Sequence, residues 1–503
     1  MLFNSLEFAI FLPIVFLLYW FVFDYALRRC KYQLWLQNLF IVIVSYIFYG
    51  WWDWRFLLLI AFTSFCSWGS GLLIRQAQNQ QPNNTAHRAK CWMILNIVLN
   101  LAILGIFKYY DFFVTSFASL FHANSDGLLL KIILPVGISF YTFQALSYSI
   151  DVYRKHLEPT KDIVSFFAYV SFFPQLVAGP IERATNLLPQ FQRKRTFDYA
   201  LAVDGMRQIL WGLFKKIVVA DNCATYVDKI FATYQDQTGS TLLLAAVLFT
   251  FQIYGDFSGY SDIAIGTGKL FGIKLMRNFN VPYFSRDIAE FWRRWHISLT
   301  TWFRDYVYIP LGGSRPVVPE HVQHPDRYKK WIIVRNTFVI FLISGFWHGA
   351  NWTFVVWGAY HAFLFLPLIL LGKNRKYTNI VAENRWFPSL RECCQMFVTF
   401  LLVVIGWIIF RANTISECLD YILRMLTNHP ISVPYLTTRA FYIPTFLSII
   451  LLCIVEWMTR IKEHEFQLTI KYAWLRWLIY YALIIIIFRC QATGNVQFIY
   501  FQF

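Results

Sequence analysis

Long apolar runs recur along the chain, and short polar stretches separate them. The run Phe8–Phe23 has no charged residue, and four others have at most one, namely Leu36–Trp52, Phe56–Ile74, Cys91–Phe107 and Trp474–Phe488. Each approaches the roughly 20 residues that a helix needs to cross the hydrocarbon core of a bilayer. Strands of a membrane barrel would be shorter and would alternate. The pattern therefore predicts an all-α, polytopic transmembrane fold with about 11 crossings.

The middle of the chain has a different pattern. Between Leu134 and Asn351, glycine, proline and charged residues interrupt the apolar runs. Such interruptions are tolerated at membrane depth where they line a protein-buried or watery cavity. We therefore expect the active part here, with re-entrant or interfacial helices. The prediction is a single integral membrane domain over 1–503, divided into N-terminal scaffold helices 1–130, a catalytic core 131–371 and C-terminal scaffold helices 372–503.

Composition agrees with a membrane protein. Of the 503 residues, 57% are hydrophobic and 15% are charged, whereas soluble domains carry roughly a quarter charged residues. The net charge of +17 does not indicate nucleic-acid binding, because lysine and arginine gather in short loops between apolar runs.

The distribution of the positive charges predicts a topology. Loops Asp24–Lys31 and Arg75–Lys90 are basic, so the positive-inside rule puts them in the cytoplasm and the N-terminus outside the cytoplasmic (inner) membrane. The segment Met1–Glu7 lacks the basic region of a cleaved signal peptide, and we expect the first run to be a retained helix.

Asp256 is the first ionisable candidate, since charged groups within apolar runs are costly and often functional. It lies between Gly255 and Gly259, which allow close helix packing or a helix break. The alternative is a polar packing motif in which Asp256 caps a helix or pairs with an arginine. Both interpretations remain open from the sequence.

The segment Phe284–Leu299 is typical of one amphipathic helix. Ser285 is the expected N-cap, and Asp287 would favour the helix N-terminus. Glu290 precedes the pair Arg293–Arg294 by three and four residues, a spacing that allows ion pairs along the helix.

His296 is the second candidate and belongs to this predicted helix. At helical spacing Trp292, His296, Leu299 and Phe303 share one face. The histidine would then look into an aromatic, apolar surface while the arginines point elsewhere. An interfacial helix or a buried packing histidine would give the same pattern, so a functional role stays one of several interpretations.

His348 is the third candidate and lies in the segment Ile343–Trp352, between two apolar runs. Gly345, Gly349 and Ala350 leave backbone space around it, as a general base needs if a hydroxyl and an acyl carbon are to approach. An apolar wall keeps an imidazole neutral, and Asn351 or a backbone amide could polarise a carbonyl or orient the ring. The alternative is a tight helix crossing with one satisfied histidine.

Several common catalytic signatures are missing from the chain. It contains no GxSxG elbow, P-loop, GxGxxG fingerprint or HExxH zinc motif. The nine cysteines form no CxxC pair, and we predict no metal site. Serine-hydrolase and ATP-driven chemistry therefore have no support.

Two histidine-containing strings identify the chain as a member of a family. Trp292–Leu299 and Phe346–Phe354 resemble the signature of the membrane-bound O-acyltransferases, and within them the AlgI-like alginate and polysaccharide O-acetyltransferase subgroup. Further strings, in the same order, resemble the family over nearly the whole chain: Leu134–Gln144, Phe173–Ile181, Gly255–Asp262, Tyr308–Gly313 and Phe498–Phe503. The loop Pro316–Lys330 is longer than in many relatives.

The resemblance implies roles that the residues alone leave open. His348 matches the family's catalytic histidine, and His296 matches its second functional histidine. The implied fold is a ring of helices around a thin core, with a funnel on each side that meets at His348. The residues expected to bind donor or acceptor are Arg293, Arg294, Trp292, Trp295, Asn351, Trp347 and Asp256.

The resemblance also implies substrates and partners. The expected reaction moves an acetyl group from a cytosolic thioester, such as acetyl-CoA, outward through the bilayer to an extracytoplasmic polysaccharide, with a secreted SGNH-type acetyltransferase as partner and no bound cofactor. The cluster Arg293, Arg294, Arg304 and Arg315 suits the phosphates of such a donor, although it could equally anchor the protein at the membrane surface. Two alternatives remain: transfer of D-alanine or another acyl group to teichoic acid or peptidoglycan, and a transporter, for which we find no inverted halves.

Overall fold

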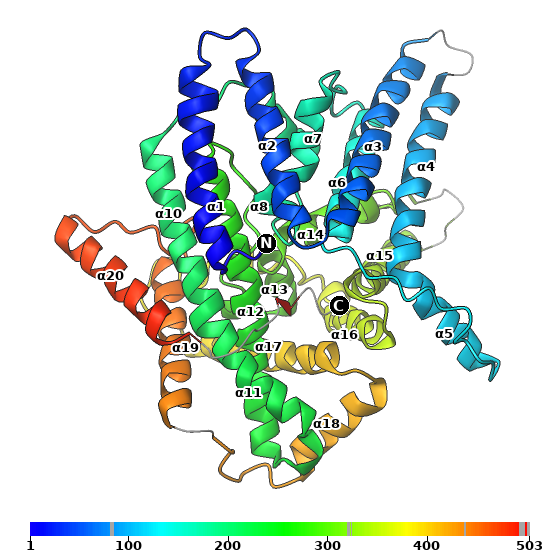
Figure 1. Ribbon diagram of the computed structural model, residues 1–503. Helices are drawn as coiled ribbons and strands as arrows, with labels where there is room; N and C mark the ends of the chain where they lie inside the picture. Colours follow the sequence, from blue (N-terminus) through cyan, green and yellow to red (C-terminus); the bar gives the residue numbers. More distant parts are fainter. Residues whose placement is uncertain (81–84, 319–321, 323, 437–438, 492–497, 500–503) are drawn as a thin grey trace. The chain divides into compact units, whose positions relative to one another are not determined.

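Helices make up the secondary structure of the computed structural model, which describes all residues except 81–84, 319–321, 323, 437–438, 492–497 and 500–503 (Figure 1). The described residues form no strand, which confirms the all-α prediction. Nine helical segments among them are long and apolar enough to cross a membrane: Leu6–Ala26, Gln33–Gly50, Trp54–Gln78, His87–Leu120, Gly239–Leu270, Pro325–His348, Trp352–Leu370, Leu390–Arg411 and Tyr442–Thr459. The predicted apolar run near the C-terminus forms α20 (Ala473–Arg489), which has 17 residues. The count of about 11 crossings stays a prediction.

The chain divides into two compact units. One consists of Met1–Ile209 and Tyr260–Met276, and the other of Leu210–Gly259 and Arg277–Phe503. The helix α12 (Gly239–Leu270) contributes residues to both. The predicted division into scaffold and catalytic core stays a prediction.

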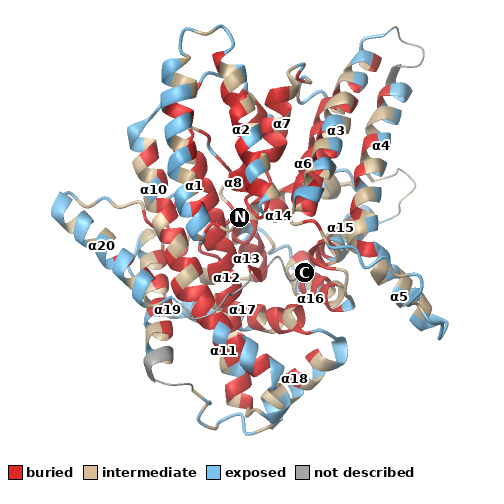
Figure 2. Ribbon diagram, viewed as in Figure 1, coloured by how far each residue is buried: buried red, intermediate tan, exposed pale blue. Residues whose placement is uncertain are grey.

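In the first unit, α6 (Ile138–Tyr153) forms the centre. Fourteen of its 16 residues are buried, and Figure 2 shows the buried residues along it. It packs against α3 (Leu57–Gln78) and α4 (Thr85–Leu104). Asn96 on α4 donates to the Ser149 hydroxyl on α6 over 2.7 Å, which satisfies two polar groups where lipid would offer none. The other helices of this unit are α1 (Leu6–Leu17), η1 (Leu18–Ala26), α2 (Gln33–Gly50), η2 (Trp54–Phe56), η3 (Gly105–Tyr109), α5 (Tyr110–Leu120), α7 (Ile163–Ser171), α8 (Phe173–Leu176), α9 (Ala184–Phe191) and most of α10 (Tyr199–Leu213).

The helix α1 shows how this unit meets lipid. Leu6, Ile10 and Ile14 recur every four residues and are all exposed, so they form one apolar stripe. Trp20, in the following π-helical segment, donates its indole N–H to the Leu270 carbonyl over 2.9 Å. One face of the predicted first crossing is therefore suited to a bilayer, while its end is anchored within the unit.

In the second unit, α15 (Pro325–His348) and α16 (Trp352–Leu370) form an antiparallel hairpin joined by three residues. A β-carbon at Gly345 would collide with the Phe354 carbonyl oxygen, and one at Gly358 with that of Phe341. The two helices therefore cross at backbone distance, as the alternative of a tight helix crossing predicted, and Phe354 occupies the space that Gly345 was expected to leave for a substrate. The other helices of this unit are η4 (Phe214–Ala220), α11 (Asp221–Ala232), η5 (Tyr234–Asp236), η6 (Pro282–Phe284), α13 (Ile288–Arg294), α14 (Ile297–Phe303), η7 (Arg304–Tyr308), α17 (Leu390–Arg411), α18 (Ile415–Thr427), α19 (Arg439–Thr459) and α20.

The predicted single helix over Phe284–Leu299 is wrong. The helix α13 ends at Arg294 and α14 begins at Ile297, with an extended residue and then a left-handed one between them. The N-cap of α13 is Asp287, whose carboxylate accepts the Glu290 backbone N–H over 2.7 Å, and not Ser285. The helical face predicted for His296 consequently does not exist.

Candidate active site

His348 ends α15 within an aromatic enclosure. Its side chain is 6% exposed. Ring centroids of Trp347, Trp357 and Phe410 lie 4.9, 5.1 and 5.4 Å from its own. The chain then turns through Gly349, where a β-carbon would collide with the Phe354 ring. The glycine next to His348 is therefore required by close packing.

Trp347 connects the two predicted histidines. Its ring centroid lies 6.0 Å from that of His296 and 4.9 Å from that of His348. His296 also packs edge-on against Phe257, at 4.6 Å between centroids. The structure thus brings together two histidines that are 52 residues apart in the sequence, with one indole in contact with both.

His296 occupies the break between α13 and α14. Its backbone has a φ of 45°, in the left-handed region that side chains other than glycine rarely adopt. Such strain persists where surrounding structure fixes it and is frequent at functional sites. Burial lowers the pKa of the His296 imidazole to about 3, because the apolar surroundings disfavour its charged form. The ring is therefore neutral at physiological pH.

Asn278 fixes the tautomer of His296. The Asn278 side-chain oxygen accepts from the Ser298 backbone N–H over 3.3 Å and from the Ser298 hydroxyl over 2.9 Å. The same oxygen lies 3.0 Å from His296 Nδ1. Since this oxygen accepts, Nδ1 must carry the proton, and Nε2 bears the lone pair. Sequence reasoning missed Asn278 because it lies in a loop without periodicity, 18 residues before the histidine.

A third histidine was also missed. His361 on α16 is fully enclosed, with ring centroids of Trp292 and Trp357 both 4.9 Å away. The Trp292 indole N–H donates to His361 Nδ1 over 3.4 Å. Trp357 in turn contacts His348, so His361 belongs to the same aromatic cluster. Its place within the long apolar run of α16 was the one available signal.

Three of the four arginines predicted to bind donor have protein partners. Arg294 is buried and pairs with Glu290 over 2.7 Å, as the spacing predicted. Arg286 binds the same carboxylate over 3.0 Å. Arg293 instead donates to the backbone carbonyls of Asn374 and Tyr377, over 3.0 and 2.6 Å. Arg286 and Arg294 also donate to the Asn379 carbonyl, over 2.8 and 3.4 Å, so that all three arginines hold α13 to the loop before α17. Of the remaining two, Arg304 pairs with Asp305 over 2.7 Å, and both Arg304 and Arg315 are exposed.

The other predicted tryptophan, Trp295, has a packing environment. It is buried, and its ring lies 4.9 Å from that of Trp407 and 5.0 Å from that of Phe279.

Asn351 was expected to polarise a substrate carbonyl or to orient the His348 ring, but its side chain has other partners in the structure. It is the N-cap of α16, and its side-chain oxygen accepts the Thr353 N–H over 3.1 Å. Its amide nitrogen donates to the Asn413 carbonyl over 2.9 Å. Helix capping therefore accounts for this asparagine at the start of α16.

Asp256 belongs to a buried charge cluster. It pairs with Lys216 over 2.8 Å, and Lys216 also pairs with Asp221 over 2.8 Å. The Ile499 backbone N–H donates to Asp256 over 2.7 Å. The partner is thus a lysine rather than the predicted arginine, and Asp256 anchors the C-terminal segment. Of the closing string Phe498–Phe503, residues 500–503 lie outside the described residues.

The two glycines that flank the Asp256 segment, Gly255 and Gly259, lie where two helices pack closely. A β-carbon at Gly255 would lie 2.9 Å from the Lys215 carbonyl oxygen, and one at Gly259 would lie 2.7 Å from that of Gly212. Close packing, and not a helix break, is the reason for both.

Metal-binding chemistry has no visible basis in the part of the chain that the structure describes. No group of three or more His, Cys, Asp or Glu side chains there could hold a metal ion. The loop Pro316–Lys330, predicted to be unusual, lies partly outside the described residues.

Comparison with known proteins gives consistent matches. Residues 91–405 match the model of the MBOAT, membrane-bound O-acyltransferase family. The chain is 41% identical over 384 residues to the probable alginate O-acetylase AlgI of Pseudomonas aeruginosa. The aligned region covers 76% of this chain and 68% of that protein. It is 33% identical over 511 residues to the peptidoglycan O-acetyltransferase of Helicobacter pylori, covering 93% and 91%. The teichoic acid D-alanyltransferase of Bacillus subtilis is 30% identical over 285 residues, covering 55% and 68%.

Proposed function

Because this chain belongs to the membrane-bound O-acyltransferase family, we propose that it is a membrane O-acetyltransferase that acts in the O-acetylation of an envelope polysaccharide. The observation that carries the proposal is the contact of His296 and His348 with one tryptophan, which brings the two histidines into one enclosed site. The relatives that cover most of this chain are O-acetylating proteins, whereas the D-alanyltransferase match covers 55% of it.

In the proposed reaction His348 is the general base. It takes the proton of an acceptor hydroxyl while the hydroxyl oxygen bonds to the carbonyl carbon of the acetyl thioester. The carbon–sulfur bond then breaks, and the departing thiolate takes the proton from the imidazolium. The rings of Trp347, Trp357 and Phe410 enclose the His348 imidazole and leave it only 6% exposed.

His296 has an assisting role in this proposal. Neutral and protonated at Nδ1, it presents the lone pair of Nε2 as an acceptor that can position a hydroxyl. Its partner Asn278 is a positioning residue, because it acts through the histidine.

The donor is a cytosolic acyl thioester such as acetyl-CoA. The exposed Arg304 and Arg315 are the arginines that remain suited to donor phosphates, since Arg293 and Arg294 donate to the loop before α17. Charge reversal at Arg304 and Arg315 should raise the apparent KM for the donor. Unchanged donor kinetics would assign these arginines to membrane-surface anchoring.

The acetyl group travels outward in this proposal. The N-terminus is outside the cytoplasmic (inner) membrane and His348 lies near the midplane, reachable from both faces. The acetyl group passes to an extracytoplasmic SGNH-type acetyltransferase partner, and from it to the polysaccharide.

The test is the chemistry of the envelope in cells that lack this protein. Mild base releases ester-bound groups, and the released acetate and D-alanine are measured separately. We expect loss of O-acetyl esters with unchanged ester-bound D-alanine, and restoration by the wild-type gene. Loss of D-alanine with unchanged acetate would overturn the proposal in favour of D-alanyl transfer.

A further inference from the structure

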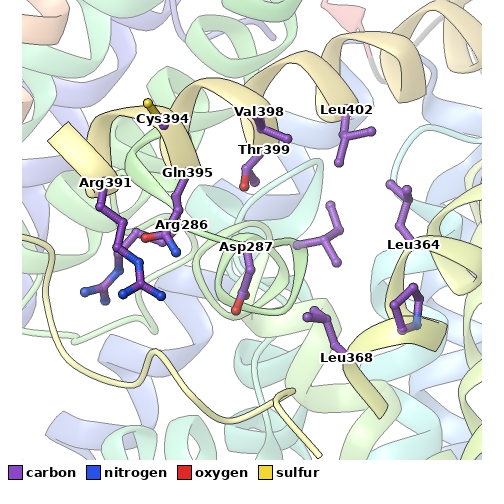
Figure 3. A pocket seen from close by; sticks show the side chains of 12 residues that line it. Arg286, Asp287, Leu364, Leu368, Arg391, Cys394, Gln395, Val398, Thr399 and Leu402 are labelled. Carbon is purple, nitrogen blue, oxygen red and sulfur yellow. The ribbon is translucent and has the colours of Figure 1, made fainter. Parts of the chain in front are cut away.

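A groove in the second unit lies outside the histidine site. It has a volume of about 450 Å³ and lies between α16, α17 and the start of α13. Figure 3 shows its lining: Arg286 and Arg391 lie toward one end, and Leu364 and Leu402 toward the other. Leu368 and Val398 extend the apolar part. Both α16 and α17 are able to cross a membrane, so the apolar part of the groove lies at a depth where acyl chains are the solvent.

The polar end of the groove lies at the level of a membrane surface. The residues Trp386 and Phe387, four and three residues before the start of α17, are 76% and 81% exposed. Exposed aromatic residues beside a membrane-spanning helix are typical of the bilayer–water interface. Arg391 is in the first turn of α17, so its guanidinium lies at the depth of lipid headgroups.

The charge at this end is positive. Arg391 is exposed and makes no hydrogen bond or ion pair within the described part of the chain, whereas Arg385 pairs with Glu392 over 3.0 Å. Arg286 is paired with Glu290, and the Asp287 carboxylate caps α13. The segment between α16 and α17 adds Lys373, Arg375 and Lys376 against Glu383. An occupant of the groove therefore meets apolar side chains along its length and an unmatched guanidinium at its end.

We propose that this groove binds one anionic phospholipid, with an acyl chain along Leu364, Val398 and Leu402 and the phosphate at Arg391. A guanidinium can hold a phosphate through two hydrogen bonds. Basic pockets between membrane helices bind anionic headgroups in this way. The lipid joins α16 to α17 and leaves the histidine site itself unoccupied, so the proposal is independent of the proposed function.

The test measures lipid binding to the purified, delipidated full chain by native mass spectrometry. Phosphatidylglycerol and phosphatidylcholine with identical acyl chains are titrated separately. Glycerol phosphate serves as a headgroup without a tail. We expect one tightly bound phosphatidylglycerol, weaker phosphatidylcholine and no glycerol phosphate at the same concentrations. Equal binding of the two lipids, or binding of glycerol phosphate alone, would overturn the proposal.

Two matched pairs of variants locate the site. Arg391→Gln should weaken phosphatidylglycerol binding about fivefold, while Arg489→Gln, which alters an exposed arginine at the end of α20, should not. Val398→Trp fills the groove and should abolish binding. Phe397→Trp changes the exposed neighbour, which does not line the groove, and should leave binding unchanged. Equal effects within either pair would show that the lipid binds elsewhere.

Discussion

At the scale of single residues, the hydrogen bond between Asn278 and His296 decides which nitrogen of a buried imidazole can accept. Asn278→Ala removes the oxygen that accepts from Nδ1 and leaves the buried N–H of His296 without this acceptor. An unsatisfied buried group of this kind costs about 1–3 kcal/mol of free energy. The same loss in the transition state, where His296 positions the hydroxyl, lowers turnover about 5- to 150-fold, and the donor KM should stay unchanged. Steady-state kinetics of the purified variant measure both quantities.

A conservative variant separates positioning from packing. Asn278→Asp keeps an oxygen acceptor and should retain most of the turnover. The added negative charge beside His296 should also raise the pKa of the imidazole and shift the acidic limb of the pH–rate profile upward. If alanine and aspartate variants behaved alike, with no change in the profile, Asn278 would have only a structural role.

The buried His296 also predicts a pH dependence of stability. Its pKa is about 3 in the folded protein against an ordinary value of 6.5. Between these values the unfolded chain binds the extra proton, so the free energy of unfolding falls as pH falls below 6.5 and is constant above it. The slope for one proton is about 1.4 kcal/mol per pH unit.

The variant His296→Asn removes this titration. Its thermal midpoint in detergent should fall less steeply than that of the wild type between pH 6.5 and pH 5, and the two curves should run parallel above pH 7. Parallel curves over the whole range would mean that His296 is solvated rather than enclosed by Phe257 and Trp347.

At the scale of elements, the crossing of α15 and α16 fixes the backbone around His348. Gly358→Ala places a methyl group against the Phe341 carbonyl, where backbone cannot yield. Overpacking of this kind costs about 1–3 kcal/mol, so both the thermal midpoint and turnover should fall.

The control is a glycine with open space around it. No atom lies within 4 Å of a β-carbon built at Gly69 in α3. Gly69→Ala should be neutral or stabilising by about 0.4–1 kcal/mol. A Gly358→Ala protein as stable and active as Gly69→Ala would contradict the tight crossing.

The sequence predicted the helical class and the local features that depend on neighbours in the chain. The pairing of Glu290 with Arg294 follows from their spacing, and a tight helix crossing was one of the two interpretations of the glycines beside His348. The break before His296 could not be predicted, because the residues around it have helical spacing and only tertiary contacts stabilise a left-handed histidine. Asn278 and His361 were missed for the same reason: their roles depend on partners 18 and 69 residues away.

At the scale of the whole molecule, the proposed path of the acetyl group depends on topology. Single cysteines in a cysteine-free background are placed in the loops Asp24–Lys31 and Arg75–Lys90, and in the turn Trp51–Arg55. An impermeant thiol reagent added to intact cells should label the turn and spare both basic loops. Labelling of the basic loops from outside would reverse the topology.

The same reagents test whether the protein is thin enough around His348 to be reached from both sides of the membrane. Cysteines near His348, placed at Phe346, Ala350 and Trp352 because Gly345 and Gly349 have no room for a side chain, should react from both faces if acetyl is relayed through the protein. Reaction from one face alone would contradict the relay and leave an acyltransferase that works within one compartment.

The central claim is that His348 performs acetyl transfer, and its most direct test is the turnover of His348→Ala. Purified wild type and variant are compared for acceptor-dependent release of thiol from an acetyl thioester, with an equal thermal midpoint as proof of folding. The exposed His87, changed to alanine, is the control. Loss of a general base typically costs about 10²- to 10⁴-fold, so His348→Ala should fall by that factor or to background, while His87→Ala keeps full activity and His296→Ala shows a large but incomplete loss. Wild-type turnover in a folded His348→Ala protein would contradict the account.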